Sequence, residues 1–314
     1  MSAKLYTAAV EMVEVSPRDG LQNEGQPVST ADKLELIRRA LAAGARRIEV
    51  TSFVNPRAVP QMADAEAVCA GLPERPDATF IGLVMNARGA ERAIATGRID
   101  QLGAVSVATD RFAMANQGQT SDGSVEAARD IVAQARSTGL TGQATIAASF
   151  GCPFEGEVPE DRVIAMATAL AGAGPVEIAL ADTIGVANPA HVASLVGKVR
   201  GAVGSIPIRV HFHNTRGTGL ANVWAAIGAG ASVVDASIGG LGGCPFAPGA
   251  AGNVATEDVV YMLERAGIGT GLDLDALIET NRWLARVMAK DLPAMVGKAG
   301  GFPRPRNDTE EDAA

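Results

Sequence analysis

The sequence predicts an α/β fold, a (β/α)8 TIM barrel with an additional C-terminal helical segment. Short runs rich in β-branched residues alternate with helical patterns, eight such units follow one another, and together they span roughly 270 residues, the usual length of one such barrel. A doubly wound open sheet is the alternative, but it would need no eighth unit. The expected organisation is a barrel over 1–270, a helix packed on it over 271–295 and a flexible tail over 296–314.

The strand candidates are short apolar runs that turn residues separate from the helical patterns. They are expected at 9–16, 47–54, 78–85, 103–108, 143–150, 176–181, 207–213 and 232–239. The first helical pattern follows Ser29, a suitable N-cap, and ends before Gly44. Residues 121–139 and 159–174 show similar starts and stops, and the eighth helix is expected at about 256–266. Residues 272–291 form an amphipathic pattern outside the eightfold count, and a segment rich in Gly, Pro and charge follows it.

Composition excludes several classes of protein. The 314 residues carry 27 basic and 35 acidic side chains, a net charge of -8 that argues against nucleic acid as the main partner. Three cysteines without a CxxC pair indicate a reducing cytosol. The N-terminal residues lack the apolar stretch of a signal peptide, and no apolar run is long enough for a membrane span. Only 4% of the residues are aromatic, so the core is expected to be aliphatic.

Polar residues collect where the strands end, at the barrel face that carries functional residues in this fold. The loop after the first strand, residues 16–24, holds more polar side chains than a simple turn requires, although a solvated Asp-Gly turn is the alternative. The seventh strand carries His211 and His213, which project to the same side with Cα atoms about 6.5–7 Å apart. They are two of only three histidines, and the third, His191, receives no role.

Other strand ends offer single candidates. The eighth strand runs into a glycine-rich loop that exposes Cys244, and Asn253 follows as either an N-cap or an oxygen ligand. Glu49 stands inside the second strand, where an inward carboxylate needs a partner. Asp182 ends the sixth strand, and an Asx turn is its alternative role.

Four of these residues form a candidate metal site. Asp19, His211, His213 and Asn253 come from strands one, seven and eight, which are neighbours in a closed barrel. Mixed nitrogen and oxygen ligands with room for substrate suit Mg²⁺ or Mn²⁺, while Zn²⁺, Co²⁺ and Fe²⁺ also accept two imidazoles.

From about residue 9 to about 290 the chain resembles the 3-hydroxy-3-methylglutaryl-CoA lyases, members of the metal-dependent lyase and aldolase barrels. The motifs that carry the resemblance are VEVSPRDGLQNE, IEVTSFVNPRAVPQM, GCPFEG, DTIGVANP, HFHNTRGTGLAN and GGLGGCPFAPGAAGNVATEDVVYML. The resemblance implies cleavage of 3-hydroxy-3-methylglutaryl-CoA to acetyl-CoA and acetoacetate at a divalent metal. It also implies a cytoplasmic homodimer that acts on an acyl-CoA in leucine degradation.

The resemblance also implies roles for individual residues. Arg18 would stabilise the enolate oxygen, and Cys244 would protonate the enolate carbon. Asp182 and His211 are the candidates for moving the hydroxyl proton, while Glu49 would orient Arg18 or assist that transfer. The substrate-binding candidates are Gln22, Asn23, Thr183 and Arg216.

Three departures from the family pattern leave the acyl chain open. Asn214 and Arg216 replace the usual Asp and Tyr after the second histidine, Thr145 stands where better-known members have Tyr, and Ala179 where they have Ser. A longer, isoprenoid-derived hydroxyglutaryl-CoA, used in terpenoid degradation, is therefore an alternative substrate. From another class, a condensing acyltransferase of the isopropylmalate or homocitrate synthase type is the alternative, which the Cys-Pro loop argues against. A barrel that binds metal without turnover is a further alternative.

Overall fold

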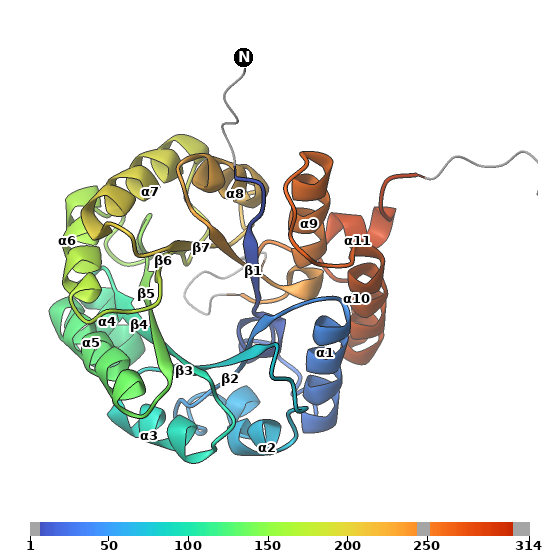
Figure 1. Ribbon diagram of the computed structural model, residues 1–314, viewed down its shortest axis with the longest axis horizontal. Helices are drawn as coiled ribbons and strands as arrows, with labels where there is room; N and C mark the ends of the chain where they lie inside the picture. The colour runs from blue at the N-terminus through green and yellow to red at the C-terminus, as the bar shows by residue number, and fades with distance from the viewer. Residues whose placement is uncertain (1–6, 244–251, 304–314) are drawn as a thin grey trace, which may run out of the picture.

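A computed structural model describes residues 7–243 and 252–303, and it confirms the predicted barrel. Eight parallel strands close in chain order, with β8 hydrogen bonded to β1 (Figure 1). The strands are β1 (Glu11–Glu14), β2 (Arg47–Ser52), β3 (Thr79–Val84), β4 (Gln101–Val107), β5 (Thr141–Ala147), β6 (Ile178–Asp182), β7 (Ile208–Phe212) and β8 (Val233–Ala236). Closure brings the ends of β7, β8 and β1 together, as the candidate metal site requires.

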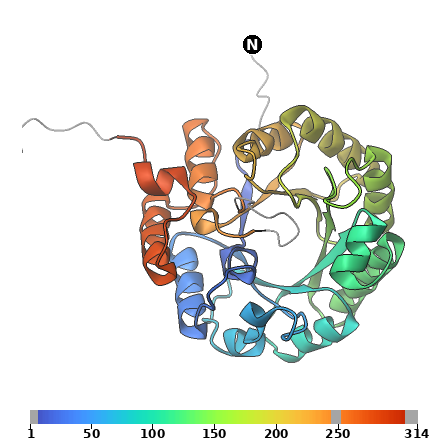
Figure 2. The ribbon, with the colours of Figure 1, turned by 180° about the vertical axis from the view of Figure 1, so that it is seen from behind.

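Helices surround the strands on all sides (Figures 1 and 2). They are α1 (Thr30–Ala42), α2 (Ala65–Ala70), α3 (Ala87–Ala95), α4 (Asp110–Gln117), α5 (Ser121–Ser137), α6 (Glu160–Ala171), α7 (Pro189–Val203), α8 (Gly219–Gly228) and α9 (Thr256–Arg265). Short turns of helix, η1 (Ser16–Gly20), η2 (Pro60–Met62) and η3 (Ile238–Gly240), lie in the loops. Ser29 caps α1 as expected, accepting the Asp32 backbone N–H, and Gly44 adopts a positive φ of 101° beyond its end.

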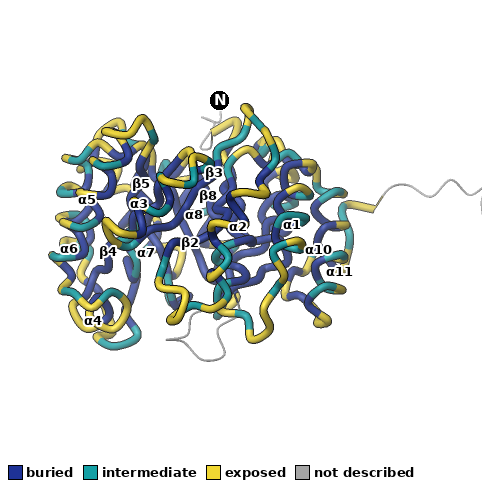
Figure 3. Tube along the Cα trace, turned by 90° about the horizontal axis from the view of Figure 1, so that it is seen from below, coloured by how far each residue is buried: buried dark blue, intermediate teal, exposed yellow. Residues whose placement is uncertain are grey.

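The core lies between the strands and the inner faces of the helices, while outer helix faces are exposed (Figure 3). Its buried members are mainly Ala, Val, Ile and Leu, as the composition predicts. Among the described residues, no helix is long and apolar enough to cross a membrane.

Two helices extend the barrel beyond its eighth unit. The predicted C-terminal helix is α10 (Leu274–Met288), which packs beside α1 and α9 (Figure 1). The expectation of a flexible tail from residue 296 was wrong for its first residues, because α11 (Met295–Ala299) forms there. The Asp258 carboxylate accepts the backbone N–H groups of Met295 and Val296, which otherwise lack partners at the start of a helix. Residues 304–314 of the expected tail lie outside the described part.

Glu257 links these helices to the loop after β8. Its buried carboxylate accepts the Gly239 backbone N–H and the side-chain amide of Asn281 on α10, at 2.5 Å. Burial raises the pKa of Glu257 from 4.5 to about 7. The folded state therefore holds a proton, between these pH values, that the unfolded chain has already lost.

Glu257→Gln is accordingly expected to flatten the pH dependence of stability. In the wild type, the free energy of unfolding should fall by roughly 3 kcal/mol on this account as pH rises from 4.5 to 7. Glutamine cannot ionise but keeps an oxygen for Gly239 and Asn281. Urea denaturation of both proteins across this range measures the difference. Glu126→Gln, at an exposed position on α5, is the control, and parallel curves for wild type and Glu257→Gln would contradict the prediction.

Candidate active site

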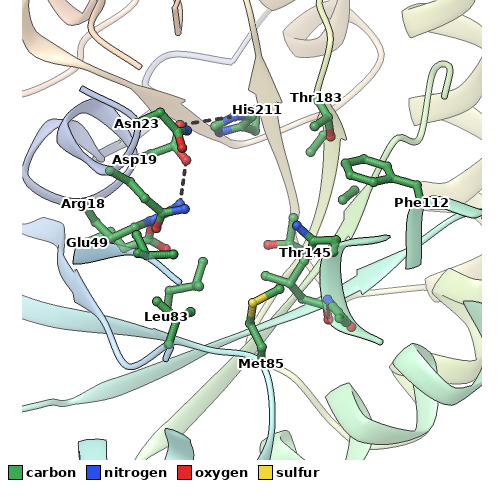
Figure 4. A pocket seen from close by; sticks show the side chains of 18 of the residues that line it. Arg18, Asp19, Asn23, Glu49, Leu83, Met85, Phe112, Thr145, Thr183 and His211 are labelled. Atoms are coloured by element: carbon green, nitrogen blue, oxygen red, sulfur yellow. Dashed lines mark hydrogen bonds and ion pairs between the residues drawn. The ribbon is translucent and has the colours of Figure 1, made fainter. Parts of the chain in front are cut away.

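A cavity of about 420 Å³ opens at the carboxyl ends of the strands. Its lining includes Arg18, Asp19, Glu49 and His211, contributed by the β1 loop, β2 and β7 (Figure 4). His213, which follows β7 directly, also lines it. The structure thus brings together five of the residues that the sequence singles out, at the barrel face where they were expected.

Three candidate metal-ligand groups converge within this cavity. Asp19 Oδ2 lies 3.9 Å from Nε2 of His211 and 3.9 Å from Nε2 of His213. Asn253 joins them, because its Nδ2 donates to the same Asp19 oxygen at 2.7 Å. Its Oδ1 and the His213 Nδ1 are buried and have no hydrogen-bond partner in the described part of the chain. Two imidazoles, a carboxylate and an unpartnered amide oxygen fit a divalent metal ion.

Asp235, on β8, orients the first imidazole and was not singled out in the sequence. Its Oδ2 lies 3.2 Å from His211 Nδ1, which leaves Nε2 directed toward Asp19. Burial opposes protonation of His211, but the Asp235 hydrogen bond and nearby carboxylates outweigh it and raise the pKa of His211. The sequence signal for Asp235 is a carboxylate inside the apolar run VVDAS, because a buried carboxylate needs a partner.

The charges of the other two ligands are set by their surroundings. Burial favours neutral Asp19, but the Arg18 guanidinium and the two imidazoles outweigh it and hold the pKa of Asp19 well below its ordinary value. Burial, with a smaller contribution from His211, lowers the pKa of His213 to about 4. At neutral pH the cluster therefore offers an ionised carboxylate and a neutral His213, the protonation states that bind a metal.

Arg18 lies between two carboxylates. Its Nη1 donates to Asp19 Oδ1 at 2.5 Å, and its Nε donates to Glu49 on β2. Burial raises the pKa of Glu49, and Arg18 opposes that rise. Because η1 places Arg18 and Asp19 side by side, one short turn supplies both a cation and a ligand to the cavity.

Close backbone packing holds the β8 loop against the ligands. Gly242 has a φ of 109°, and a Cβ there would lie 2.4 Å from Asn253 Nδ2. Asn23 Nδ2 donates to the Gly243 carbonyl at 2.6 Å and so connects the β1 loop to this segment. Cys244 follows directly but lies outside the described residues, so the structure does not place its thiol.

Glu14, at the end of β1, was also not singled out. Its buried carboxylate accepts the backbone N–H groups of Ser16 at 2.9 Å and Ile238 at 3.0 Å, and the Thr256 hydroxyl at 2.7 Å. One side chain therefore joins the β1 loop, the β8 loop and the start of α9.

Asp182 and Thr183 both bond to backbone. The two oxygens of Asp182 accept the N–H groups of Val186 and Ala187, each at 2.9 Å, and Asp182 is not among the cavity-lining residues. These acceptors hold the loop after β6 through residues four and five positions further on, which is not the Asx turn named as the alternative. Thr183 lines the cavity, and its Oγ1 accepts the N–H of Ala148.

The remaining substrate-binding candidates separate into two groups. Gln22 and Asn23 line the cavity. Arg216 does not, because its Nη1 donates to the carbonyls of Ile184 and Gly185 in the β6 loop, at 3.0 and 2.9 Å.

Comparison with known proteins finds one matching family model, HMGL-like, over residues 9–284. The (R)-citramalyl-CoA lyase of Chloroflexus aurantiacus is 44% identical, over 93% of this chain and 95% of that protein. The 3-hydroxy-3-isohexenylglutaryl-CoA/hydroxymethylglutaryl-CoA lyase of Pseudomonas aeruginosa is 39% identical, over 92% of this chain and 96% of that protein. An HMG-CoA lyase from Acinetobacter baumannii, solved with coenzyme A and 3-methylmalate, is 41% identical with a TM-score of 0.90, over 97% of this chain and 100% of that one.

Proposed function

Because the chain belongs to the HMGL-like family and is a carbon–carbon lyase, we propose that it cleaves 3-hydroxy-3-methylglutaryl-CoA to acetyl-CoA and acetoacetate. The observation that carries this proposal is the convergence of Asp19, His211 and His213 beside Arg18 in one cavity. A retro-aldol cleavage needs a group that polarises the substrate hydroxyl and a cation for the enolate oxygen, and these residues supply places for both.

Asp19, His211, His213 and Asn253 would hold the metal, which we propose is Mg²⁺ or Mn²⁺, with Zn²⁺ and Co²⁺ as alternatives. When bound, a divalent ion lowers the pKa of a coordinated hydroxyl and so favours its deprotonation. The role of the protein is to fix the ligands, and Asp235 does this for His211 by engaging Nδ1.

The remaining steps fall to side chains around the cavity. Arg18, held by Asp19 and Glu49, would place its guanidinium against the oxygen on which negative charge develops as the carbon–carbon bond breaks. Both Asp182 oxygens accept backbone hydrogen bonds, so we assign the hydroxyl proton to the cavity-lining groups His211 and Glu49. Glu49 suits this role because its raised pKa favours proton uptake.

Cys244 would protonate the enolate carbon. We expect Cys244→Ala to bind metal like the wild type and to lose most of its turnover, because no other acid is assigned to that carbon. Acetyl-CoA release and Mn²⁺ titration measure the two properties. Cys69→Ala, at a buried cysteine on α2, is the control. Wild-type turnover in Cys244→Ala would remove the thiol from the mechanism.

A coupled assay for acetyl-CoA release tests the function itself. The panel contains 3-hydroxy-3-methylglutaryl-CoA, (R)-citramalyl-CoA and a 3-hydroxyglutaryl-CoA with a longer alkyl group, each with Mg²⁺ or Mn²⁺. The citramalyl thioester is included because the relative from Chloroflexus aurantiacus bears that name. Cleavage of none of them would reject the lyase assignment, and preference for the longer alkyl group would favour the isoprenoid substrate.

We propose the cellular setting from the family resemblance. The resemblance supports a cytoplasmic homodimer that acts in leucine degradation, with terpenoid degradation as the alternative.

A further inference from the structure

A second arginine, Arg209, lies inside the barrel below the metal-ligand cluster. It stands on β7 two residues before His211, lines the same cavity, and its side chain is 2% exposed. Its Nη2 donates to Thr145 Oγ1 on β5 at 2.9 Å. The strand register pairs Thr145 with Ala179 and Ala179 with Arg209, so this hydrogen bond reaches across β6 at the level of Ala179.

We call Thr145, Ala179 and Arg209 the Arg209 floor. It accounts for two departures that the family resemblance left unexplained. Thr145 contacts the guanidinium through its short side chain. Ala179, fully buried between the two, presents only a methyl group to the side chain that passes it. The small residues at 145 and 179 therefore make room for Arg209.

Carboxylates contact two nitrogens of the guanidinium, and one of these carboxylates, Asp235, also lines the cavity. Arg209 Nη1 donates to both oxygens of Asp235 at 2.9 Å, and Arg209 Nε lies 2.9 Å from Glu177, which Arg47 also binds at 2.8 Å. Within the described part of the chain Nη2 donates only to Thr145, so it retains a second N–H. A cation that borders a cavity in this way favours an anion on the cavity side, because an unpaired buried donor is costly.

The proposed substrate supplies such an anion. Its acyl group has a thioester at one end, a free carboxylate at the other and the hydroxyl between them. Arg18 stands beside the metal ligand Asp19, where the thioester oxygen is expected. Arg209 lies one layer deeper than His211, since alternate residues of a strand are about 6.5–7 Å apart. Figure 4 shows Thr145 on the side of the cavity away from Arg18 and Glu49.

We propose that the Arg209 floor binds the free carboxylate of the acyl group and makes the site specific for acyl-CoA substrates that end in a carboxylate. The inference rests on the proposed function for the nature of the substrate. It assigns Arg209 as a specificity-determining residue, with Thr145 positioning its Nη2.

Binding of an uncleavable ligand tests the floor independently of turnover. 3-Methylglutaryl-CoA lacks the hydroxyl, and its methyl ester lacks the negative charge as well. We expect the wild type to bind the acid roughly 10- to 100-fold more tightly than the ester, the range for a hydrogen bond to a charged group. Arg209→Met should reduce this ratio to near one, and Arg209→Lys should restore part of it. Calorimetry at constant metal concentration measures the ratio.

Arg47→Met is the matched control, because Arg47 also binds Glu177 but does not line the cavity. It should lower stability and leave the ratio unchanged. If Arg209→Met does not fold, Thr145→Val provides the test, with a several-fold fall in the ratio expected. Equal binding of acid and ester by the wild type, or an unchanged ratio in the folded variant, would overturn the proposal. Failure of the proposed function would instead be seen as selective binding of the acid without cleavage of the hydroxylated thioesters.

Discussion

Asp19→Asn is expected to lower Mn²⁺ affinity by about 100-fold or more. Loss of a residue that only hydrogen bonds to a metal ligand costs about 10- to 100-fold, and loss of a ligand itself should cost more. Asp19 supplies the only charged oxygen within reach of both imidazoles in the described part of the chain. Asparagine also brings an NH2 group where Arg18 and Asn253 already donate to the carboxylate, at 2.5 and 2.7 Å. Turnover should fall by about 1,000-fold or more, because the ligand and the partner of Arg18 are lost together.

The measurement is a Mn²⁺ titration followed by acetyl-CoA release at saturating metal. Asp64→Asn is the control, since Asp64 is a partly buried aspartate that pairs with Lys33 at 2.6 Å away from the cavity. It should retain metal binding and turnover. An Asp19→Asn protein that binds Mn²⁺ with wild-type affinity would remove Asp19 from the ligand set.

The barrel was predictable from the sequence because it follows from local periodicity, and so was the approach of Asp19 to His211 and His213 at one barrel face. A strand places alternate residues on one side, so His211 in β7 and His213 directly after it converge without knowledge of any distant contact. Chain order in a closed barrel then brings the β1 loop beside β8.

Features that depend on distant partners were not predictable. Helix α4 was not foreseen, and the backbone N–H of Arg111 in its first turn bonds Glu155 from another loop, at 2.7 Å. Helix α11 depends in the same way on Asp258. Glu14, Asp235 and Arg209 were visible as charges inside apolar strands, but only the register shows which groups they meet.

The sequence did indicate that the acyl pocket departs from the family pattern, at Thr145 and Ala179. It did not show why, because the residue that explains both stands on a third strand. Arg209 donates a hydrogen bond to Thr145 across Ala179. One hypothesis about the substrate therefore accounts for both small residues.

Arg18→Met is expected to lower kcat by about 100- to 1,000-fold, the cost of removing one group that stabilises a developing oxyanion. Methionine fills a similar volume without charge, so Glu49 loses its cationic partner and Asp19 keeps its contact with Asn253. Metal affinity should be retained or increased, because a cation beside the ligands opposes binding of a second cation. This separates the variant from Asp19→Asn, in which affinity and turnover fall together.

The measurement combines Mn²⁺ titration with single-turnover acetyl-CoA release, and Arg98→Met, at a partly buried arginine that binds Glu74, is the control. Arg18→Lys should recover little activity, because an ammonium cannot present the planar fork that contacts Asp19 and Glu49 at once.

A smaller variant, Arg18→Ala, should regain turnover when guanidinium is added, since the added ion can occupy the space between the two carboxylates. If Arg18→Met instead loses its metal and keeps its kcat at saturating Mn²⁺, Arg18 organises the ligands and does not stabilise the enolate.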